Sequence, residues 1–334
     1  MARGSERIHT RIVFTSAVLL ASGCSLLFGL DDHQAGLGSG DEAGIDGDVP
    51  DQGNPGEGGG EQDGGSDAPP GDCQGAAFKN AKPIAGLENG ANQYSARAIN
   101  DGKTVYLSSE RPVDGPKDAG SHIFTASRTD PLGSFGAVEL PPGNVNSSGL
   151  QRHAIATDDD LRMFYIQVTG AALGQVWWAA RDASTSEFIS GGAISQLQGQ
   201  TYSDVYATPN GDHLYVASTK GGKLDIYVST LQGTTYSSPA AVGGINTNAD
   251  DYAPVVSVDL KTMYFASTKS GQAQVYAAKG TNGTTFQNVT PVCGLGAPNE
   301  SAYPTWLSST GAILYYVKYT GTGGTRELWQ AEIK

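Results

Sequence analysis

The chain has 334 residues, of which 46 are glycine, and its formal net charge is −13. The charge is uneven, because residues 31–72 contain twelve Asp and Glu and no Lys or Arg, whereas residues 73–334 contain 18 basic and 21 acidic residues. A body this close to neutral, without a basic stripe, argues against nucleic acid as a partner, since phosphate binding requires clustered Lys and Arg.

The first residues predict export. Three arginines precede an apolar stretch of about ten residues, which is too short to span a bilayer as a helix. The stretch ends in LLASGC, and this pattern resembles a bacterial lipoprotein signal. The resemblance implies that residues 1–23 are removed and that Cys24 carries a membrane-anchoring lipid. Ser25 then implies an extracytoplasmic location at the outer membrane of a Gram-negative bacterium. The alternative is an ordinary secretory signal with an incidental cysteine.

Residues 24–75 form the next segment, which begins with the lipidated cysteine and continues as an acidic stretch rich in Gly, Asp and Pro. After its first few residues this segment has almost no large apolar residues, so it buries too little surface to offset the entropy of ordering. We expect it to be a disordered linker.

A repeat occupies residues 76–334. Residues 213–218 and 225–229 alternate polar and apolar side chains around a Gly-rich turn, which predicts a β-hairpin. Aromatic residues at three positions of such units recur with a period near 50: Tyr106, Phe164, Tyr215, Tyr264 and Tyr315; Phe124, Trp177, Tyr227, Tyr276 and Trp329; Phe78, Phe135, Phe188, Tyr236 and Phe286. Short strands at this period are typical of the blades of a β-propeller.

The count of units predicts an all-β, five-bladed propeller with four antiparallel strands in each blade. The segment FKNAKPIAGL at 78–87 precedes the first complete unit and matches FQNVTPVCGL at 286–295, whereas the last unit stops after its third strand. We therefore expect the N-terminal strand to complete the last blade and close the ring, because an open ring leaves sheet edges exposed.

The units resemble the TolB-type, WD-repeat-like propellers of bacterial envelope proteins. The segments NDGKTVYLSSERP (100–112), PNGDHLYVASTKGGKLDIY (209–227) and VDLKTMYFASTKSGQAQVY (258–276) carry the family pattern of a turn, Leu-Tyr-Phe-x-Ser and Ile-Tyr. The resemblance covers about 260 residues and implies the fold. It also implies that the blades serve mostly as a binding scaffold.

Motifs for catalysis are missing from the sequence. It contains no GxSxG elbow, HExxH, P-loop or CxxC, and we expect neither a metal nor a cofactor. Glycoside hydrolysis requires paired carboxylates, and the inner strands offer Asp204, with Asp251 and Glu300 in the loops before two of them. The expectation is therefore no enzyme, with a propeller glycoside hydrolase or lyase acting on polysaccharide as the alternative.

One set of residues predicts a binding site at the mouth of the central channel. Arg97, His153 and Asp204 would lie below a ring of aromatic side chains that precede or open the inner strands: Tyr94, Tyr202, Tyr252 and Tyr303. Aromatic rings with scattered polar groups suit sugars, peptides or partner loops. The alternative is that each Tyr packs between adjacent blades.

These features together predict a lipid-anchored, monomeric cell-envelope propeller. It would act as a non-catalytic binding or scaffolding module for an unidentified envelope protein, peptide or glycan. A purely structural surface lipoprotein, without any concave site, is a further alternative.

Cys73 and Cys293 are the two cysteines that remain when Cys24 is lipidated, and an exported chain permits disulfides. Cys293 would lie on the outer strand of the fourth blade, and Cys73 just before the strand that completes the fifth, which favours a bridge between them. The expected positions along those two strands argue the other way, because Cys293 falls near the far end of its strand. Both outcomes stay open.

Overall fold

The structure is a computed structural model that describes residues 77–99, 102–113, 120–147, 149–168, 173–297, 300–319 and 324–334. The predicted signal (1–23) and the whole predicted linker (24–75) lie outside these residues. The described part is all-β apart from one short 3-10 turn. No helix in these ranges is long and apolar enough to cross a membrane.

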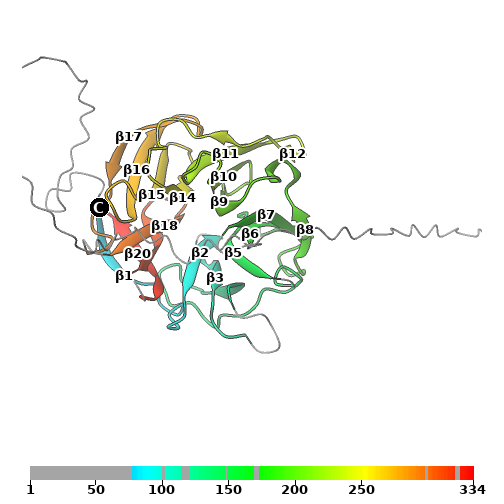
Figure 1. Ribbon diagram of the computed structural model, residues 1–334. Coiled ribbons are helices and arrows are strands. Elements are labelled where there is room, and N and C mark those ends of the chain that lie inside the picture. Colours follow the sequence, from blue (N-terminus) through cyan, green and yellow to red (C-terminus); the bar gives the residue numbers. More distant parts are fainter. Residues whose placement is uncertain are drawn as a thin grey trace, which may run out of the picture.

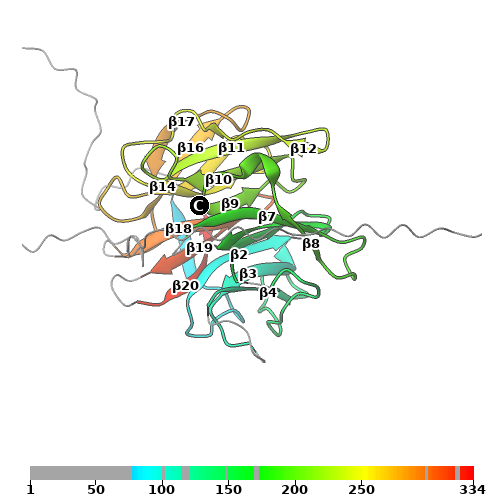
Figure 2. The same cartoon turned by 45° about the vertical axis from the view of Figure 1, so that its right-hand side comes forward.

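Antiparallel sheets surround a common centre (Figures 1 and 2). The first sheet contains β2 (Gln93–Ile99), β3 (Thr104–Ser109) and β4 (His122–Ser127). A nine-stranded sheet follows, with β5 (Leu150–Ala156), β6 (Arg162–Val168), β7 (Gly174–Ala180), β8 (Ile189–Ala193), β9 (Tyr202–Ala207), β10 (His213–Ser218), β11 (Asp225–Gln232), β12 (Thr235–Tyr236) and β13 (Ala240–Ala241). It spans two repeat units that a single residue pair, Gly174 with Tyr202, joins.

Two four-stranded sheets complete the fold. One contains β14 (Asp251–Val256), β15 (Thr262–Ser267), β16 (Gln274–Gly280) and β17 (Phe286–Pro291). The other contains β18 (Ser301–Leu307), β19 (Ile313–Tyr319), β20 (Arg326–Ile333) and β1 (Phe78–Pro83), in the order β1-β20-β19-β18. The N-terminal strand therefore pairs with the last strand of the chain, with Phe78 opposite Ile333 and Pro83 opposite Trp329.

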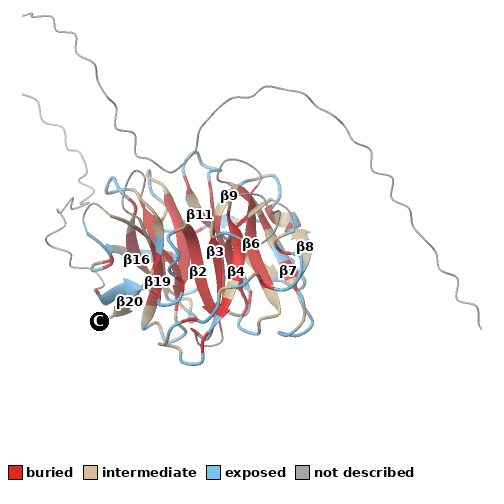
Figure 3. Ribbon diagram, turned by 90° about the horizontal axis from the view of Figure 1, so that it is seen from below, coloured by how far each residue is buried: buried red, intermediate tan, exposed pale blue. Residues whose placement is uncertain are grey.

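The repeated aromatic residues explain why the sheets pack together. The five aromatic residues of the second strands (Tyr106, Phe164, Tyr215, Tyr264 and Tyr315) are all buried, and Figure 3 shows the buried residues concentrated along the strands. Burial of an aromatic side chain removes a large apolar area from water, so each unit gains its stability by packing on its neighbours.

Hydrogen bonds tie neighbouring sheets to one another, and three of them involve second-strand tyrosines. Tyr106 donates to Asp160 and Tyr215 donates to the Gly283 carbonyl, both at 2.7 Å. The first and last sheets also make contact, because Arg128 donates to the Tyr315 hydroxyl at 2.7 Å.

Two glycines lie against the backbone of the neighbouring sheet, one at Phe78 and one at Phe135. Gly294 has φ +84, and a Cβ there would lie 2.3 Å from the Phe78 carbonyl oxygen. Gly86 has φ +88, and its Cβ would lie 2.3 Å from the Phe135 carbonyl oxygen. Any other residue would be both strained and crowded at these two positions, so glycine permits the close approach on either side of β1.

Not every unit has the expected four regular strands. The segment after β4 makes only an isolated bridge between Thr125 and Glu139, before Pro141 and Pro142. The outer strand of the next-but-one unit is split into β12 and β13, with Pro239 between them. Proline lacks the N–H that a ladder needs, so Pro239 accounts for the split between β12 and β13.

Cys293 lies beside the start of β1. Its carbonyl accepts a hydrogen bond from the Phe78 N–H at 2.9 Å, and its backbone bridges Ala77. Cys293 is disulfide-bonded. Cys73, the predicted partner, lies outside the described residues. The sequence placed Cys293 far along its strand from the start of β1, but the structure places Cys293 beside Ala77, four positions after Cys73 in the sequence.

Candidate functional site

Each inner strand (β2, β5, β9, β14 and β18) contains an irregularity in its pairing register. In β5 it falls between Arg152 and Ile155 and gives His153 a φ of 55°. The matching bulge in β14 gives Ala253 a φ of 50°. A bulge redirects side chains. The backbone bulge occurs in more than one unit, but β5 has an imidazole there, where β14 has Ala253.

His153 pairs with Asp204 of the neighbouring inner strand. Its Nδ1 lies 3.1 Å from Oδ1 of Asp204, and the two side chains are 11% and 4% exposed. Burial lowers the pKa of His153 to about 4, although Asp204 opposes this shift. At neutral pH the ring is therefore uncharged, and the carboxylate fixes the proton on Nδ1 and leaves the lone pair on Nε2.

Arg97 lies beneath this pair and is 1% exposed. It donates from Nη1 to the Val205 carbonyl, and its guanidinium lies 5.5 Å from the centre of the Tyr206 ring. Burial lowers the pKa of Arg97 to about 10, so it stays cationic at neutral pH. This fixed charge helps to keep His153 neutral.

Two more arginines converge on Tyr94. The guanidinium carbons of Arg152 and Arg326 lie 4.0 Å and 5.3 Å from the centre of its ring. Arg152 also donates to the Tyr94 hydroxyl at 3.1 Å, and that hydroxyl donates to Glu110. Burial is the main cause that raises the pKa of Tyr94, which therefore remains a phenol at neutral pH.

Tyr252 and Tyr303 close the other side, with ring centres 6.1 Å apart. Burial raises the pKa of Tyr303 to about 12, and Arg326 is hydrogen-bonded to it. The charge of Asp204 acts on both tyrosines, which places them near the His153 pair. We call the whole group the channel cluster: Tyr94, Arg97, Glu110, Arg152, His153, Asp204, Tyr252, Tyr303 and Arg326.

Three predicted site residues take other positions. Tyr202 is fully buried within the main hydrophobic core. Asp251 is fully buried and accepts from the N–H and the hydroxyl of Thr247. Glu300 accepts from the Ala297 N–H at 2.7 Å and pairs with Lys318 at 2.9 Å.

Arg152, Arg326 and Glu110 belong to the channel cluster but were not among the predicted site residues. Arg152 directly precedes His153, so its neighbourhood was readable from the sequence. Arg326 starts the last strand of the chain, and Glu110 follows β3, so neither lies on an inner strand. Among the described residues, no group of three or more His, Cys, Asp or Glu side chains is arranged to hold a metal ion.

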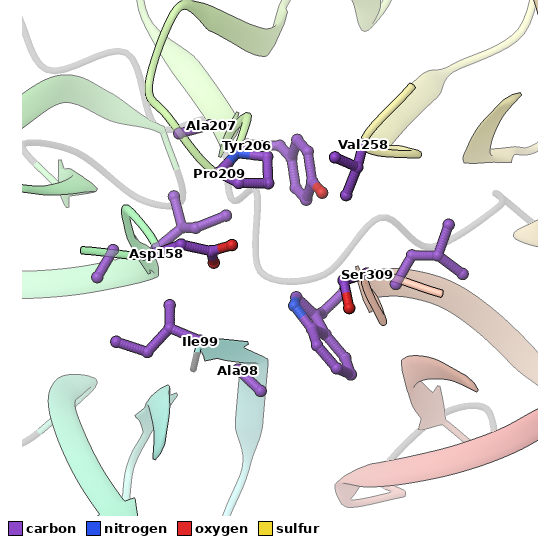
Figure 4. A pocket seen from close by; sticks show the side chains of 12 residues that line it. Ala98, Ile99, Asp158, Tyr206, Ala207, Pro209, Val258 and Ser309 are labelled. Atoms are coloured by element: carbon purple, nitrogen blue, oxygen red, sulfur yellow. The ribbon is translucent and has the colours of Figure 1, made fainter. Parts of the chain in front are cut away.

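The opposite end of the inner strands encloses a different space. An open hollow of about 450 Å³ lies there, including the solvent at its mouth, and its lining includes Ile155, Trp306 and Leu307. Figure 4 shows Asp158, Tyr206 and Val258 around this hollow. Most of its lining residues are of apolar types, and they include no histidine or arginine.

The chain was compared with known proteins. No family model and no curated sequence matches it. Among solved structures, β-1,2-mannobiose phosphorylase from Listeria innocua matches with a TM-score of 0.53 at 13% identity, covering 77% of this chain and 97% of that one. A family 117 glycoside hydrolase from the marine bacterium Zobellia galactanivorans matches with a TM-score of 0.51 at 11% identity, covering 77% and 90%.

TolB from Acinetobacter baumannii matches at 11% identity with a TM-score of 0.39, covering 73% of this chain and 55% of that one. This match is too distant to support an argument. The comparisons support the β-propeller fold that the repeat predicts.

The expectations of a non-catalytic binding or scaffolding module and of no enzyme are wrong on these comparisons. The two structures described above with TM-scores above 0.5 are a glycoside hydrolase and a mannobiose phosphorylase, which favours the polysaccharide-enzyme alternative. The acidic residues lie in segments that resemble the rest of the repeat, and this resemblance led to the expectation of a scaffold. At these identities the likeness itself shows the fold alone.

Proposed function

We propose that this protein is a carbohydrate-active propeller enzyme that cleaves glycosidic bonds of a polysaccharide, with its reaction centre at the channel cluster. The observation that carries the proposal is the His153–Asp204 pair, 3.1 Å apart, which arginines and tyrosines surround. Support comes from the two matched structures with TM-scores above 0.5, both of which act on glycosides by their descriptions.

The pair has the properties of a proton-transfer centre. A neutral imidazole whose Nδ1–H is held by a carboxylate presents a basic Nε2 in a fixed direction. When Nε2 takes a proton, the Asp204 carboxylate stabilises the imidazolium that forms. Proton transfer by a positioned side chain contributes typically about 10²- to 10⁴-fold to the rate.

The tyrosines supply the second requirement, which is a place for sugar rings. Tyr303 is partly exposed beside the pair, whereas Tyr94 and Tyr252 are buried next to it, so Tyr303 offers the aromatic contact area. Burial raises the pKa of all three tyrosines, which stay protonated at neutral pH. The Tyr94 hydroxyl donates to Glu110, whereas the Tyr303 hydroxyl accepts from Arg326 and retains its own proton for a sugar oxygen.

The test is a release assay. The full chain is incubated with a panel of neutral and acidic polysaccharides, and new reducing ends are measured. We expect cleavage of at least one polymer, and a loss of about 10²- to 10⁴-fold in kcat for His153→Asn. Asparagine suits this variant because it tolerates the positive φ of position 153.

The matched control is His213→Asn. His213 starts β10 and stacks on Tyr215 with ring centres 6.3 Å apart, so the same chemical change is made outside the channel cluster. The control should keep activity within about twofold. If no polymer is cleaved, or if His153→Asn cleaves as fast as the native chain, the proposal fails.

We also propose that the sheets form five blades in a ring that β1 closes. The support is the β1–β20 pairing, the close approach of Gly294 to Phe78 and of Gly86 to Phe135, and the contact of Arg128 with Tyr315. Deletion of residues 77–83 should lower the free energy of unfolding far more than deletion of seven linker residues. Equal urea midpoints for the two deletions would contradict closure.

The location and covalent state of the chain remain proposals from the sequence. We propose a TolB-type repeat protein anchored by lipid at Cys24, so Cys24→Ala should release it from the membrane fraction. We also propose a disulfide between Cys73 and Cys293, supported by the bridge of Ala77 to Cys293. Mass spectrometry of a non-reduced digest should find the linked peptides, and two alkylatable thiols would contradict the pairing.

A further inference from the structure

The channel cluster has an excess of positive charge. Three guanidinium groups, those of Arg97, Arg152 and Arg326, face two carboxylates, those of Asp204 and Glu110. Nearby, Lys318 pairs with Glu300 at 2.9 Å, and the charge of Asp250 reaches Tyr252 at the edge of the cluster. This excess occurs in a body that is otherwise slightly acidic, so it is a local feature of the site.

The arrangement of two of these arginines indicates an anionic ligand. Arg152 and Arg326 come from strands of different sheets, yet both lie over the Tyr94 ring, at 4.0 Å and 5.3 Å from its centre. Together with the cation of Arg97, these two guanidinium groups give the cluster a positive potential that attracts an anion. The planar guanidinium is suited to bind a carboxylate through two parallel hydrogen bonds.

The carboxylates on and near the channel cluster are not arranged for hydrolysis. Hydrolysis of a glycoside requires two carboxyl groups that face one sugar. Asp251 is fully buried against Thr247, and Glu300 is paired with Lys318. Glu110 accepts hydrogen bonds from Tyr94 and from Asn92. The group that is oriented for proton transfer is an imidazole.

We infer that the substrate is a uronate-containing polysaccharide and that the enzyme cleaves it by β-elimination, with His153 as the base and Arg152 and Arg326 bound to the uronate carboxylate. This inference rests on the proposed function and specifies its substrate class and reaction. A carboxylate at C5 of the sugar is what makes the neighbouring C–H bond acidic enough to lose a proton to an imidazole.

The step balances without any further reagent. Nε2 of His153 takes the proton from C5, and the electron pair of that C–H bond forms the double bond between C4 and C5. The bond between C4 and the glycosidic oxygen breaks, and this oxygen keeps the electron pair. The Tyr303 hydroxyl protonates the leaving oxygen, and the proton on His153 returns to Tyr303 through solvent. The guanidinium groups stabilise the charge that develops on the carboxylate.

The experiment compares acidic polymers with their own neutral derivatives. The full chain is incubated with polygalacturonate, alginate and heparosan, and with the same polymers after chemical reduction of their carboxyl groups. Reducing ends and the ultraviolet absorbance of the unsaturated uronate are recorded in parallel. We expect both signals to rise together on at least one native polymer, and neither to rise on its carboxyl-reduced form.

Two failures are distinguishable. Reducing ends without the absorbance, or equal cleavage of a carboxyl-reduced polymer, would overturn the β-elimination inference while the proposed function stands. No cleavage of any acidic or neutral polymer would overturn the proposed function, and the inference with it.

A substitution tests the role of the arginines. Arg152→Gln should raise KM for the cleaved uronate polymer by roughly 10- to 100-fold, since a hydrogen bond between charged groups is lost. The control, Arg162→Gln, removes an arginine of the same chain that donates to the Asn210 carbonyl outside the channel cluster. If Arg152→Gln leaves KM unchanged, or if both variants raise KM equally, the assignment of the carboxylate site is wrong.

Discussion

The two ends of the inner strands differ in chemistry although the same strands build both. From the middle of each strand, β2 and β5 place Arg97 and His153 in the channel cluster. Two residues later the same strands place Ile99 and Ile155 around the hollow. The repeat therefore determines the backbone at both ends, whereas the charged and titratable side chains gather at one.

The contrast shows where a repeat permits specialisation. The register irregularity falls at different depths along the inner strands, from the start of β2 to the second half of β18. A bulge leaves side chains outside the ordinary alternation, so they are free to take functional roles without loss of core packing, as His153 does in β5. The regularly paired residues mainly fill the core, and Arg97 of β2 is an exception.

The largest expected difference between the ends comes from removing one carboxylate at each. Asp204→Asn should lower kcat on the cleaved polymer by about 10²-fold or more, because the His153 tautomer is no longer fixed. The acidic limb of the pH–rate profile should also move to lower pH, since Asp204 raises the pKa of His153.

The matched change at the other end is Asp158→Asn, which alters a carboxylate that lines the hollow. It should leave kcat and the pH–rate profile unchanged. An equal loss of activity in both variants would mean that the two ends are not functionally distinct.

A second variant should show the opposite pattern. Trp306 is 9% exposed, lines the hollow and packs on Tyr315 with ring centres 4.6 Å apart. Trp306→Ala should lower the free energy of unfolding by about 3–5 kcal/mol through the cavity that it leaves. The residual folded protein, measured well below its urea midpoint, should keep its kcat. Lost activity with unchanged stability would reverse the assignment of the ends.

The third prediction concerns pH. The pKa of His153 is lowered to about 4 in the folded state by burial and by Arg97, Arg152 and Arg326, against the opposing effect of Asp204. The unfolded chain therefore binds this proton first, and stability falls as the pH decreases from about 6.5 to about 4.

The size of this effect is about 3 kcal/mol at most, from the difference between the two pKa values. It is measured by urea unfolding of the native chain and of His153→Asn at pH 7 and pH 4. The native chain should lose more stability than the variant over this range. Parallel losses in both proteins would mean that His153 is not held neutral.

The smallest effect is expected from Val258→Ser. Val258 lines the hollow but is 51% exposed. The free energy of unfolding should change by no more than about 0.5 kcal/mol, because exposed substitutions away from packed groups usually have small effects. A loss above about 2 kcal/mol would show that the hollow is covered in solution.

Much of the fold was predictable because the aromatic positions repeat. All five second-strand aromatics lie on β-strands, and the N-terminal strand pairs with the last strand as expected. The interruptions after β4 and within the outer strand that includes β12 were not predicted, although Pro239, which splits the second of these, is visible in the sequence. The periodicity of the aromatic positions outweighed these local signals.

The site was predictable where it depends on position along an inner strand. Tyr94, Arg97, His153 and Asp204 were identified in this way, and the structure brings them together. Arg152 was missed because strict alternation places it on the opposite face from His153, and the bulge removes that alternation.

Other features of the site were not readable from sequence. Arg326 was missed because its contact with Tyr94 depends on how the last sheet meets the first. The pairing of His153 with Asp204 joins two repeat units, and no local pattern indicates a contact between residues so far apart. Without that pair, the acidic residues looked like parts of an ordinary repeat, which led to the wrong expectation about catalysis.

The pairing of β1 with β20 also has a consequence for synthesis. While the chain emerges from the ribosome, the strand that is made first has no partner until the last residues have been made. Until then β1 and the edge of the neighbouring sheet are open to pairing with other chains. Contacts across so long a sequence separation form slowly. A chain truncated before Arg326 should therefore aggregate during production, even though nearly all of its sheets could already be folded.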